Sequence, residues 1–508
     1  MGKLHVKLAG FNVDRGSLQD AIDKITEGSP NGAINILNNL TPETISAAYA
    51  RISRDPSNLA DLRKIAREQV DASRKTNEAI IFTMGHKSIA EHAFLNFDIE
   101  HLSRKAVETV EKKRLMSFTE KSQRYITLDG DYVVPNELKG TPEEKLFIEN
   151  IEKQNQFYNT NLEKLKNWHF NQDYSELFKS LNCKSLEKQK VTTEGLGKED
   201  ARYPLAMATE AQLGISVSAR NLESLITMLQ SSELEELKEL GEKLFTEVDG
   251  IAPSVIKYTK PTLYFQQTRK DLETFASQIT AGKLFKADSL SNVQLFEKLS
   301  RDDSILAGLL FSSSNMNYAT CLNVVQNMDR YEKGLLVELS QKYQEVHDPK
   351  LREFELGDRV AEFKMSSSAF AQMKRHRMNT LIPQKYNPML GYTTPKSIIC
   401  TGLKDEFENI LNQSTNTYYH LLKQGYSSDV AEYVLTNAHK RRVLLDANNR
   451  QIVAIICAER KNLPAQWDIR ELIDEYSKLV QKSCPLTLKF LPGKDKFYDF
   501  KKVWSGEE

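Results

Sequence analysis

Two clusters of side chains that can grip an anion stand in different halves of the chain. The first closes the stretch 117–125, where Arg124 offers paired N–H donors to a phosphate or a pyrimidine carbonyl edge and Ser122 adds a hydroxyl. The second is the Arg-His-Arg run at 375–377, with the amide of Gln372 one turn earlier. A structural turn and a helix end neutralised by cations are the simpler alternatives. Each cluster keeps what the other lacks, which indicates one binding site built from both.

Two further motifs add candidates. The run at 85–92 reads Gly-His-Lys-Ser-Ile-Ala-Glu-His and carries His86 and Ser88. No metal site is expected there, because no third ligand lies near its two histidines in sequence, and a hydrogen-bonded turn is the alternative. Arg460 follows a largely apolar run, and a buried guanidinium must find an anionic or carbonyl partner. Arg460 is therefore a candidate substrate contact, whereas Trp467 is expected to pack inward on the next helix.

The composition limits the class of protein. The 508 residues suffice for two or more domains, and 40% hydrophobic with 27% charged residues is typical of a globular protein. A formal net charge of zero argues against binding a nucleic acid polymer, whereas local basic clusters suit a small phosphorylated ligand. The five cysteines are scattered, and neither a signal peptide nor a long apolar run is found. We expect a cytoplasmic protein without disulfides, bound metal or a membrane span.

The same order of elements is predicted twice. In the first half we expect a strand within 1–10, helices over 16–80, a strand at 93–99, a helix at 103–113 and a loop at 114–125. In the second half we expect helices over 293–346, a strand ending at 363–365, a helix at 367–377, a loop at 378–395 and a helix near 403–425. Residues 136–200 are rich in Lys, Glu and Asn and are expected to form solvent-facing helices. Two long units in one order indicate a tandem duplication.

These motifs together resemble the flavin-dependent thymidylate synthase family. Its signature reads Arg-His-Arg-x-x-Ser-x-Asn-Glu-x-Ser-x-Arg-Tyr, with Gly-His-x-Ser-x-x-Glu-His before it and Ala-Gln-Trp-Glu-Ile-Arg after it. The first half matches at 85–92, at 117–125 and at Arg202, but has Lys-Lys-Arg at 112–114 and Thr119 in place of Asn. The second half matches at 375–377, at Arg460 and at 465–470. It lacks the Ser-x-Arg-Tyr ending, and its Gln-Lys-Tyr at 384–386 aligns only with a gap.

The resemblance implies an α+β fold made of two tandem thymidylate-synthase-complementing-type domains. We expect these domains at 1–275 and 276–508, each with a mixed sheet flanked by helices. Members of the family are homotetramers whose active sites take residues from neighbouring subunits. The chain is therefore expected to form a homodimer that mimics the tetramer, with two working sites. The reciprocal sites would carry Thr109, Leu229 and Glu432 in place of substrate contacts.

The resemblance also implies the chemistry and the roles of individual residues. The expected reaction is methylation of dUMP to dTMP, with FAD, NADPH and methylene-tetrahydrofolate as cofactors. Arg460 would be the catalytic residue and stabilise negative charge on the uracil. The expected substrate-binding residues are Gln372, Arg375, Glu120, Ser122, Gln123, Arg124 and Arg202. The expected cofactor-binding residues are His86, Ser88, Glu120, Arg375, His376, Arg377 and Asn449.

Two other functions remain open from the sequence. The Lys-Lys-Arg run at 112–114 and Thr119 leave room for a related flavoenzyme that acts on another pyrimidine nucleotide or uses another one-carbon donor. The chain would otherwise be a non-catalytic nucleotide-binding paralogue. The complementary motifs of the two halves argue against that paralogue, since drift without selection would not spare matching parts. Flavin bound to the purified protein would favour either enzyme.

Overall fold

The chain forms two compact units that do not coincide with its two halves. The computed structural model describes residues 2–52, 55–83, 86–263, 265–267, 291–295, 302–341, 350–499 and 502. The first unit contains Met1–Ser122, Gly130–Lys145 and Ala208–Phe285, and the second contains Gln123–Asp129, Leu146–Met207 and Lys286–Glu508. The second unit thus combines the second half with two segments of the first. The expected domain boundary between 275 and 276 lies outside the described residues.

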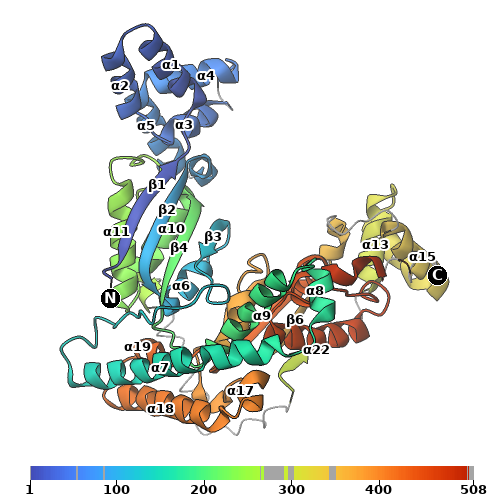
Figure 1. The fold of residues 1–508 in the computed structure, drawn as a ribbon. Coiled ribbons are helices and arrows are strands. Elements are labelled where there is room, and N and C mark those ends of the chain that lie inside the picture. The colour runs from blue at the N-terminus through green and yellow to red at the C-terminus, as the bar shows by residue number, and fades with distance from the viewer. Residues whose placement is uncertain are drawn as a thin grey trace. The chain divides into compact units, whose positions relative to one another are not determined.

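The first unit is built on a four-stranded sheet with the order β1-β2-β4-β3 (Figure 1). Its strands are β1 (His5–Phe11), β2 (Phe94–Ser103), β3 (Met116–Glu120) and β4 (Glu210–Ser218). Along β2 the side chains of Leu95, Phe97 and Ile99 are buried, as expected for a strand with one face on the core. Helix α6 (Arg104–Glu111) follows β2, and α10 (Ala219–Gln230) and α11 (Glu235–Val248) pack on one another beside the sheet.

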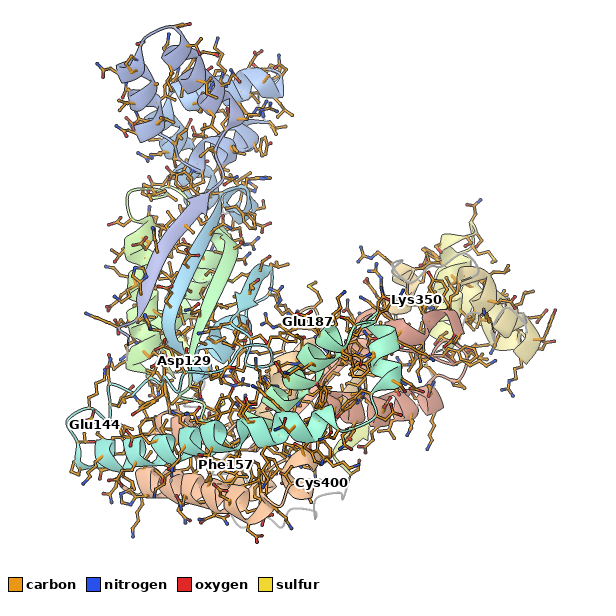
Figure 2. The ribbon with its side chains drawn as sticks, in the orientation of Figure 1. Asp129, Glu144, Phe157, Glu187, Lys350 and Cys400 are labelled. Carbon is orange, nitrogen blue, oxygen red and sulfur yellow. The ribbon has the colours of Figure 1, made fainter. Side chains whose placement is uncertain are left out.

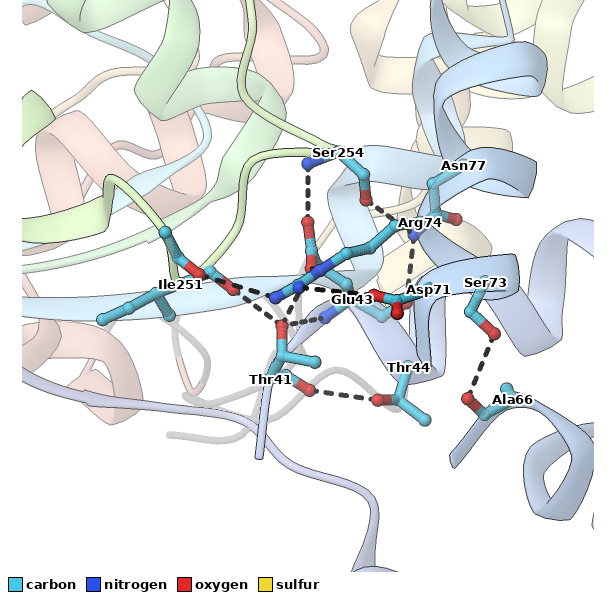
Figure 3. Close-up of polar contacts among 11 residues, drawn as sticks. Thr41, Glu43, Thr44, Ala66, Asp71, Ser73, Arg74, Asn77, Ile251 and Ser254 are labelled. Carbon is cyan, nitrogen blue, oxygen red and sulfur yellow. Dashed lines mark hydrogen bonds and ion pairs between the residues drawn. The ribbon is translucent and has the colours of Figure 1, made fainter. Parts of the chain in front are cut away.

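A helical region precedes β2 in the first unit. Its helices are α1 (Arg15–Thr26), α2 (Pro30–Asn38), α3 (Glu43–Arg51), α4 (Leu59–Glu68), α5 (Val70–Glu78), the π-helix η1 (Ala79–Thr83) and the 3₁₀ helix η2 (Lys87–His92). Figure 3 shows how the buried Glu43 ties these helices to the segment after α11. Its carboxylate accepts from Arg74 Nε at 2.7 Å and from the backbone N–H of Ser254 at 2.6 Å. Because both hydrogen bonds are made to a buried charge, they hold this helical region against the segment that follows α11.

The second unit repeats the strand order as β5-β6-β8-β7. Its strands are β5 (Val293–Leu295), β6 (Asp358–Ser366), β7 (Thr380–Pro383) and β8 (Lys440–Asn448). All described strand pairs of both units are antiparallel, so the expectation of mixed sheets was wrong. Strand direction depends on how the long connections return the chain, and hydrophobic periodicity does not report that. The loops expected at 114–125 and 378–395 were also wrong in part, because they contain β3 and β7.

The helices of the second unit come from both halves of the chain. The first half supplies most of α7 (Pro142–Phe170), with α8 (Ser175–Ser180) and α9 (Leu186–Ala201). The second half supplies α13 (Asp302–Ser312), α14 (Tyr318–Asn327), α15 (Arg330–Gln341), η3 (Arg352–Glu355), α16 (Ser367–Met373), η4 (Pro388–Leu390), α17 (Lys396–Cys400), α18 (Lys404–Lys423), α19 (Ser428–Ala431), η5 (Glu432–Val434), α20 (Asn449–Gln451), η6 (Ile452–Cys457), α21 (Ala458–Arg460), α22 (Trp467–Ser483) and η7 (Lys494–Lys496). No helix in the described ranges is both long enough and apolar enough to cross a membrane.

One hydrophobic core joins the two halves inside the second unit. Phe157 of α7 packs on Phe407 of α18 with ring centroids 6.0 Å apart, and Figure 2 marks Phe157 on α7. Asn150 Nδ2 donates to Thr417 Oγ1 at 3.1 Å between the same helices. The buried members of this shared core are Leu128, Phe157, Tyr158, Leu162, Leu165, Ala201, Tyr203, Leu205, Ile398, Leu403, Phe407, Ile410, Leu411 and Ala438. The expectation of solvent-facing helices over 136–200 was therefore wrong for α7, whose inner face is apolar and buried.

Equivalent residues of the two halves pair with each other in this unit. Ala206 and Thr436 form an antiparallel bridge, and each precedes its strand, β4 or β8, by the same number of residues. Met207 N–H donates to Leu435 O, and Asn437 N–H donates to Leu205 O, both at 2.8 Å. Contacts in which each residue meets its own counterpart are typical of a twofold interface between identical subunits. A local twofold axis thus passes through a single chain.

The two halves also match without a gap around the anion-binding clusters. Ser103 caps α6 and Ser366 caps α16, each hydroxyl accepting a backbone N–H of its helix at 3.0 Å. Ser117 pairs with Ser216 in the first sheet, and Thr380 pairs with Asp446 in the second. The intervening stretches have the same length, because Ser117 follows Ser103 at the same spacing as Thr380 follows Ser366.

This register corrects the gapped alignment of the second half. Counted from the two caps, Thr109 takes the place of Gln372. Beyond the short strands, Lys385 takes the place of Ser122 and Asn387 takes the place of Arg124. Strand pairing fixes register, and motif letters alone do not, which explains the error.

Candidate functional site

Arg460 lies at the end of an interrupted helix that follows β8. The matching helix of the first unit, α10, is a continuous α-helix that begins after the cap residue Ser218 and contains Leu229. In the second unit the π-helix η6 separates α20 from α21, and the cap residue is Asn448. A π turn holds one residue more than an α turn. Arg460 therefore stands one residue further from its cap than Leu229 does, and takes the angular position of Leu229.

The guanidinium of Arg460 is held by α16 and the turn after it. Its Nε donates to His376 Nε2 at 2.8 Å, and its Nη1 donates to Gln372 Oε1 at 3.3 Å. Its Nη2 lies 3.4 Å from a carboxylate oxygen of Glu459. The side chain is only 14% exposed. Two directed hydrogen bonds in a partly dry setting give this cation a fixed orientation, as an electrostatic catalyst requires.

His376 acts on Arg460 as a neutral acceptor. Burial lowers its pKa to about 3, and the adjacent positive charge of Arg460 adds to that effect. A protonated imidazole would have no lone pair for the Arg460 N–H and would repel the guanidinium. The sequence assigned His376 to the cofactor, whereas its closest polar partner in the structure is Arg460. Its position makes it a positioning residue for that arginine.

Three guanidiniums from separate segments belong to this site. Burial lowers the pKa of Arg460, the carboxylate of Glu459 opposes that effect, and the charges of Arg124 and Arg375 lower the pKa further. Arg124 is paired with the buried carboxylate of Glu199, and its Nη2 donates to Pro464 O at 3.2 Å. Arg124 belongs to the first half, and the other two arginines belong to the second. Because the charges of Arg124 and Arg375 both disfavour the cation of Arg460, an anion bound beside it would be favoured.

An unpaired buried donor lies beside these cations. Gln372 is 8% exposed, and its Nε2 has no hydrogen-bond partner among the described residues. Leaving a buried donor unpaired costs about 1–3 kcal/mol. Its Oε1 is already occupied by Arg460, so the free amide group can only donate. A ligand with a carbonyl acceptor would satisfy it.

Asn437 connects the two first-half segments to the second half, and no sequence motif points to it. Its Nδ2 donates to Gln123 Oε1 at 3.2 Å and to Arg202 O at 3.0 Å. Both expected site residues are buried in the second unit. The charge of Arg202 also acts on the buried carboxyl of Asp468, where burial raises the pKa and Arg202 is among the groups that oppose it. Asn437 stands outside every recognisable motif, so only the tertiary structure reveals it.

Other expected site residues lie elsewhere. His86 and Ser88 are exposed at the start of η2 in the first unit, and Gly85 lies outside the described residues. Glu120 ends β3 and pairs with Leu213, and Ser122 follows it within the first unit. The structure thus brings Gln123, Arg124, Arg202, Gln372, Arg375, His376, Arg377 and Arg460 into one unit and leaves His86, Ser88, Glu120 and Ser122 in the other.

Asn449 belongs to an interior network. It is fully buried, accepts from Arg359 Nη1 and donates to Thr487 Oγ1 at 3.2 Å. Thr487 in turn donates its backbone N–H to Asp302 at 3.0 Å. These partners join β6 and α13 to the C-terminal segment. These contacts of Asn449 therefore support the core, and its expected contact with a cofactor stays a prediction.

The buried His376 and His439 of the second unit should make the protein less stable in mild acid. Burial lowers the pKa of His376 to about 3 and that of His439 to about 4, against about 6.5 when unfolded. Between the folded and the unfolded pKa values, the unfolded chain binds more protons than the folded chain does. The contribution of these histidines to the free energy of unfolding is therefore fully present above about pH 6.5 and is lost as the pH falls. We expect a loss of about 2 kcal/mol for each histidine at pH 5. Urea unfolding at neutral pH and at pH 5 measures it.

His376→Asn supplies the control for this pH dependence. Asparagine keeps an acceptor for Arg460 but cannot titrate, so the difference between the two pH values should shrink by about 2 kcal/mol. An undiminished difference would show that His376 takes up its proton as easily in the folded state.

Comparisons with known proteins match both halves. The family model described as thymidylate synthase complementing protein matches residues 35–254 and 338–486. The chain is 26% identical over 253 residues to a flavin-dependent thymidylate synthase of Clostridium tetani, a match that covers 49% of this chain and 90% of that relative. It is 21% identical over 485 residues to the UPF0159 protein Ta1429 of Thermoplasma acidophilum, covering 88% and 94%. A solved UMP/dUMP methylase, PolB of Streptomyces cacaoi bound with 5-Br dUMP, is 14% identical with a TM-score of 0.33, covering 51% of this chain and 95% of that one.

Proposed function

This chain belongs to the thymidylate synthase complementing protein family, and on that premise we propose that it methylates dUMP to dTMP at a site composed from both of its halves. Its curated relatives include flavin-dependent thymidylate synthases, and it is a methyltransferase-type enzyme. The observation that carries the proposed site is the hydrogen bond from Arg460 to Gln372, whose Nε2 is unpaired, together with the charges of Arg124 and Arg375 that act on Arg460. Such a site offers several fixed positive charges and one donor to a ligand.

The chemistry of dUMP complements this set of groups. Its phosphate would bind Arg124 and Arg202, which are permanently charged and can donate in pairs. A uracil carbonyl would accept from Gln372 Nε2 and remove the cost of that unpaired donor. Arg460 would then stand beside the base and stabilise negative charge as the ring is activated. Gln123 would hold its loop in place through Asn437.

The cations at the end of α16 fit a flavin cofactor. Arg375 and Arg377 are half-buried, and guanidiniums pair well with the two phosphates of FAD. When bound, FAD would take reducing equivalents from NADPH and pass them to the one-carbon unit of methylene-tetrahydrofolate. We also propose that His86, Ser88, Glu120, Ser122 and Asn449 contribute to binding, as the family motifs imply.

Two measurements test the proposal in sequence. The purified protein should be yellow or should take up FAD with a saturable absorbance change. It should then release tritium from dUMP labelled at C5 when NADPH and methylene-tetrahydrofolate are supplied. Protein that cannot bind FAD would exclude both this enzyme and a related flavoenzyme. Flavin binding without tritium release from dUMP would favour the related flavoenzyme, which acts on another pyrimidine nucleotide.

Gln372→Thr should weaken dUMP binding about tenfold, as loss of one hydrogen bond worth about 1.4 kcal/mol predicts. Threonine is the residue that stands at the matching position of the first half, as Thr109. Calorimetric titration with dUMP measures the change. Thr109→Gln is the matched control and should leave the affinity unaltered, because the first half has Leu229 at the position that Arg460 takes in the second half. Equal losses in both variants would refute the assignment of Gln372.

The duplication itself supports a particular assembly. The Clostridium tetani relative aligns with about half of this chain, whereas the Thermoplasma acidophilum relative aligns with most of it. The local twofold pairing at Ala206 and Thr436 replaces an interface that separate copies would form. We propose that two chains associate as a homodimer that mimics a tetramer. Light scattering that finds only the 58.0 kDa monomer would contradict this assembly.

A further inference from the structure

A cavity in the second unit is walled by aromatic rings. It has a volume of about 600 Å³ and lies among the end of α7, α8, α17 and the segment that leads into α22. Its lining includes Trp168, Tyr174 and Trp467. The chain has three tryptophans, and two of them line this one cavity. Aromatic walls at this density suit a ligand that offers its face or its positive charge to π systems.

A buried carboxylate fixes two of these rings, those of Trp467 and Tyr174. Asp200 is 2% exposed and accepts from Trp467 Nε1 at 2.9 Å, while its other oxygen lies 2.9 Å from His169 Nε2. His169 Nδ1 lies 2.6 Å from the hydroxyl of Tyr174, and the two rings are stacked. One face of Trp467 stacks on Tyr203 with centroids 5.8 Å apart. The walls are therefore set before any ligand arrives, which lowers the entropy cost of binding.

The charges around the cavity favour a cation. Asp173, Glu176 and Glu471 line it, against Lys396 and Arg470. Arg470 Nη1 is engaged with Leu463 O at 2.7 Å, and its charge acts on Glu471. Asp173 and Glu176 are exposed at the α8 side, where they can attract a positive ligand. Carboxylates at the rim and π faces within are the arrangement that recognises organic cations.

We propose that this cavity binds a planar heteroaromatic cation, which stacks against Trp168 and Trp467 with the carboxylates of Asp173 and Glu176 beside it. None of Arg124, Arg375 and Arg460 lines this cavity, and the proposal does not depend on the proposed methylation. It also gives a ligand-binding role to Trp467, which the sequence predicted to pack inward. Trp467 does both, since one face packs on Tyr203 while the ring also borders the cavity.

Quenching of tryptophan fluorescence by 1-methylnicotinamide tests the proposal on the full chain. This probe is a planar pyridinium cation, and nicotinamide and nicotinate are its neutral and anionic counterparts. We expect saturable quenching by 1-methylnicotinamide. Nicotinamide should bind more weakly than this cation, and nicotinate should bind most weakly. Linear quenching without saturation, or tighter binding of nicotinate, would overturn the proposal.

Two variants locate the binding. Trp168→Leu should raise the dissociation constant at least about tenfold, as loss of one stacking ring predicts. Glu176→Lys changes an exposed residue of α8 that has no role in the core, so it should fold normally and still weaken the cation. Far-ultraviolet circular dichroism checks the fold of both. Unchanged saturation curves in Glu176→Lys and in a folded Trp168→Leu would place the probe elsewhere and refute the site.

Discussion

Arg460→Ala should lower the rate of dUMP methylation by roughly 10² to 10³-fold, the loss expected when one preorganised charge is removed from a developing anion. The alanine variant also releases His376 Nε2 and Gln372 Oε1 from their shared donor. Gln372 would then lose its fixed orientation, so dUMP affinity should fall as well. Arg460→Lys keeps a charge but not the two directed bonds, and should recover only part of the rate. Tritium release measures the rate, and calorimetry measures the affinity.

Arg352→Ala is the control for Arg460→Ala. Its side chain is 83% exposed, and an ion pair joins it to Glu355 on the same short helix. This variant should keep full activity, because an exposed pair of this kind contributes little. A rate within about threefold of wild type for a folded Arg460→Ala protein would rule out Arg460 as the catalytic cation.

Arg124→Ala should weaken dUMP binding by roughly 100-fold, the effect of losing a charge-assisted bidentate contact. The expectation is informative because Arg124 belongs to the first half, whereas Arg460 belongs to the second. Asn387→Ala is the matched control, since Asn387 takes the place of Arg124 in the second half. That variant should bind dUMP normally. Equal binding defects in both would mean that each half carries its own site, against the composite arrangement.

The ion pair of Arg124 needs a second control. Glu199 is 2% exposed, and Arg124→Ala leaves its carboxylate buried without its cation. Breaking a buried pair in this way typically costs 3–5 kcal/mol. Weak binding could then result from partial unfolding. Arg124→Ala combined with Glu199→Ala removes both charges, so it should regain stability while dUMP binding stays weak. Recovery of binding in the double variant would show that Arg124 serves the fold alone.

Most elements were predictable because their periodicity is local. The strand at 93–99 and the helix near 403–425 correspond to β2 and α18. The strands β3 and β7 were missed because each is short, and β7 also lies in a segment rich in Pro and Asn. Met116 and Phe118 alternate with polar residues, with Met116 buried and Phe118 half-buried, and that pattern was a usable signal.

The candidate site was predictable only as far as its motifs reach. Arg124, Gln372 and Arg460 stand in recognisable patterns, so their residue types pointed to an anion site before any fold was known. Glu199 and Asn437 stand in no such pattern, and their roles depend on contacts between segments distant in sequence. The π turn before Arg460 was equally hidden, since one added residue leaves no mark in composition.

The pairing of Ala206 with Thr436 has an evolutionary consequence. On the axis of a dimer of identical chains, every substitution faces a copy of itself, so each change is tested twice at once. In this chain the two sides of the axis are encoded separately, and they already differ, with alanine facing threonine. Each half was thereby free to lose what the other retained. The same divergence is hard to reverse. If the proposed site is composed from both halves, neither half alone encodes a complete set of ligand contacts. Dividing the gene in two would therefore not restore a functional single copy.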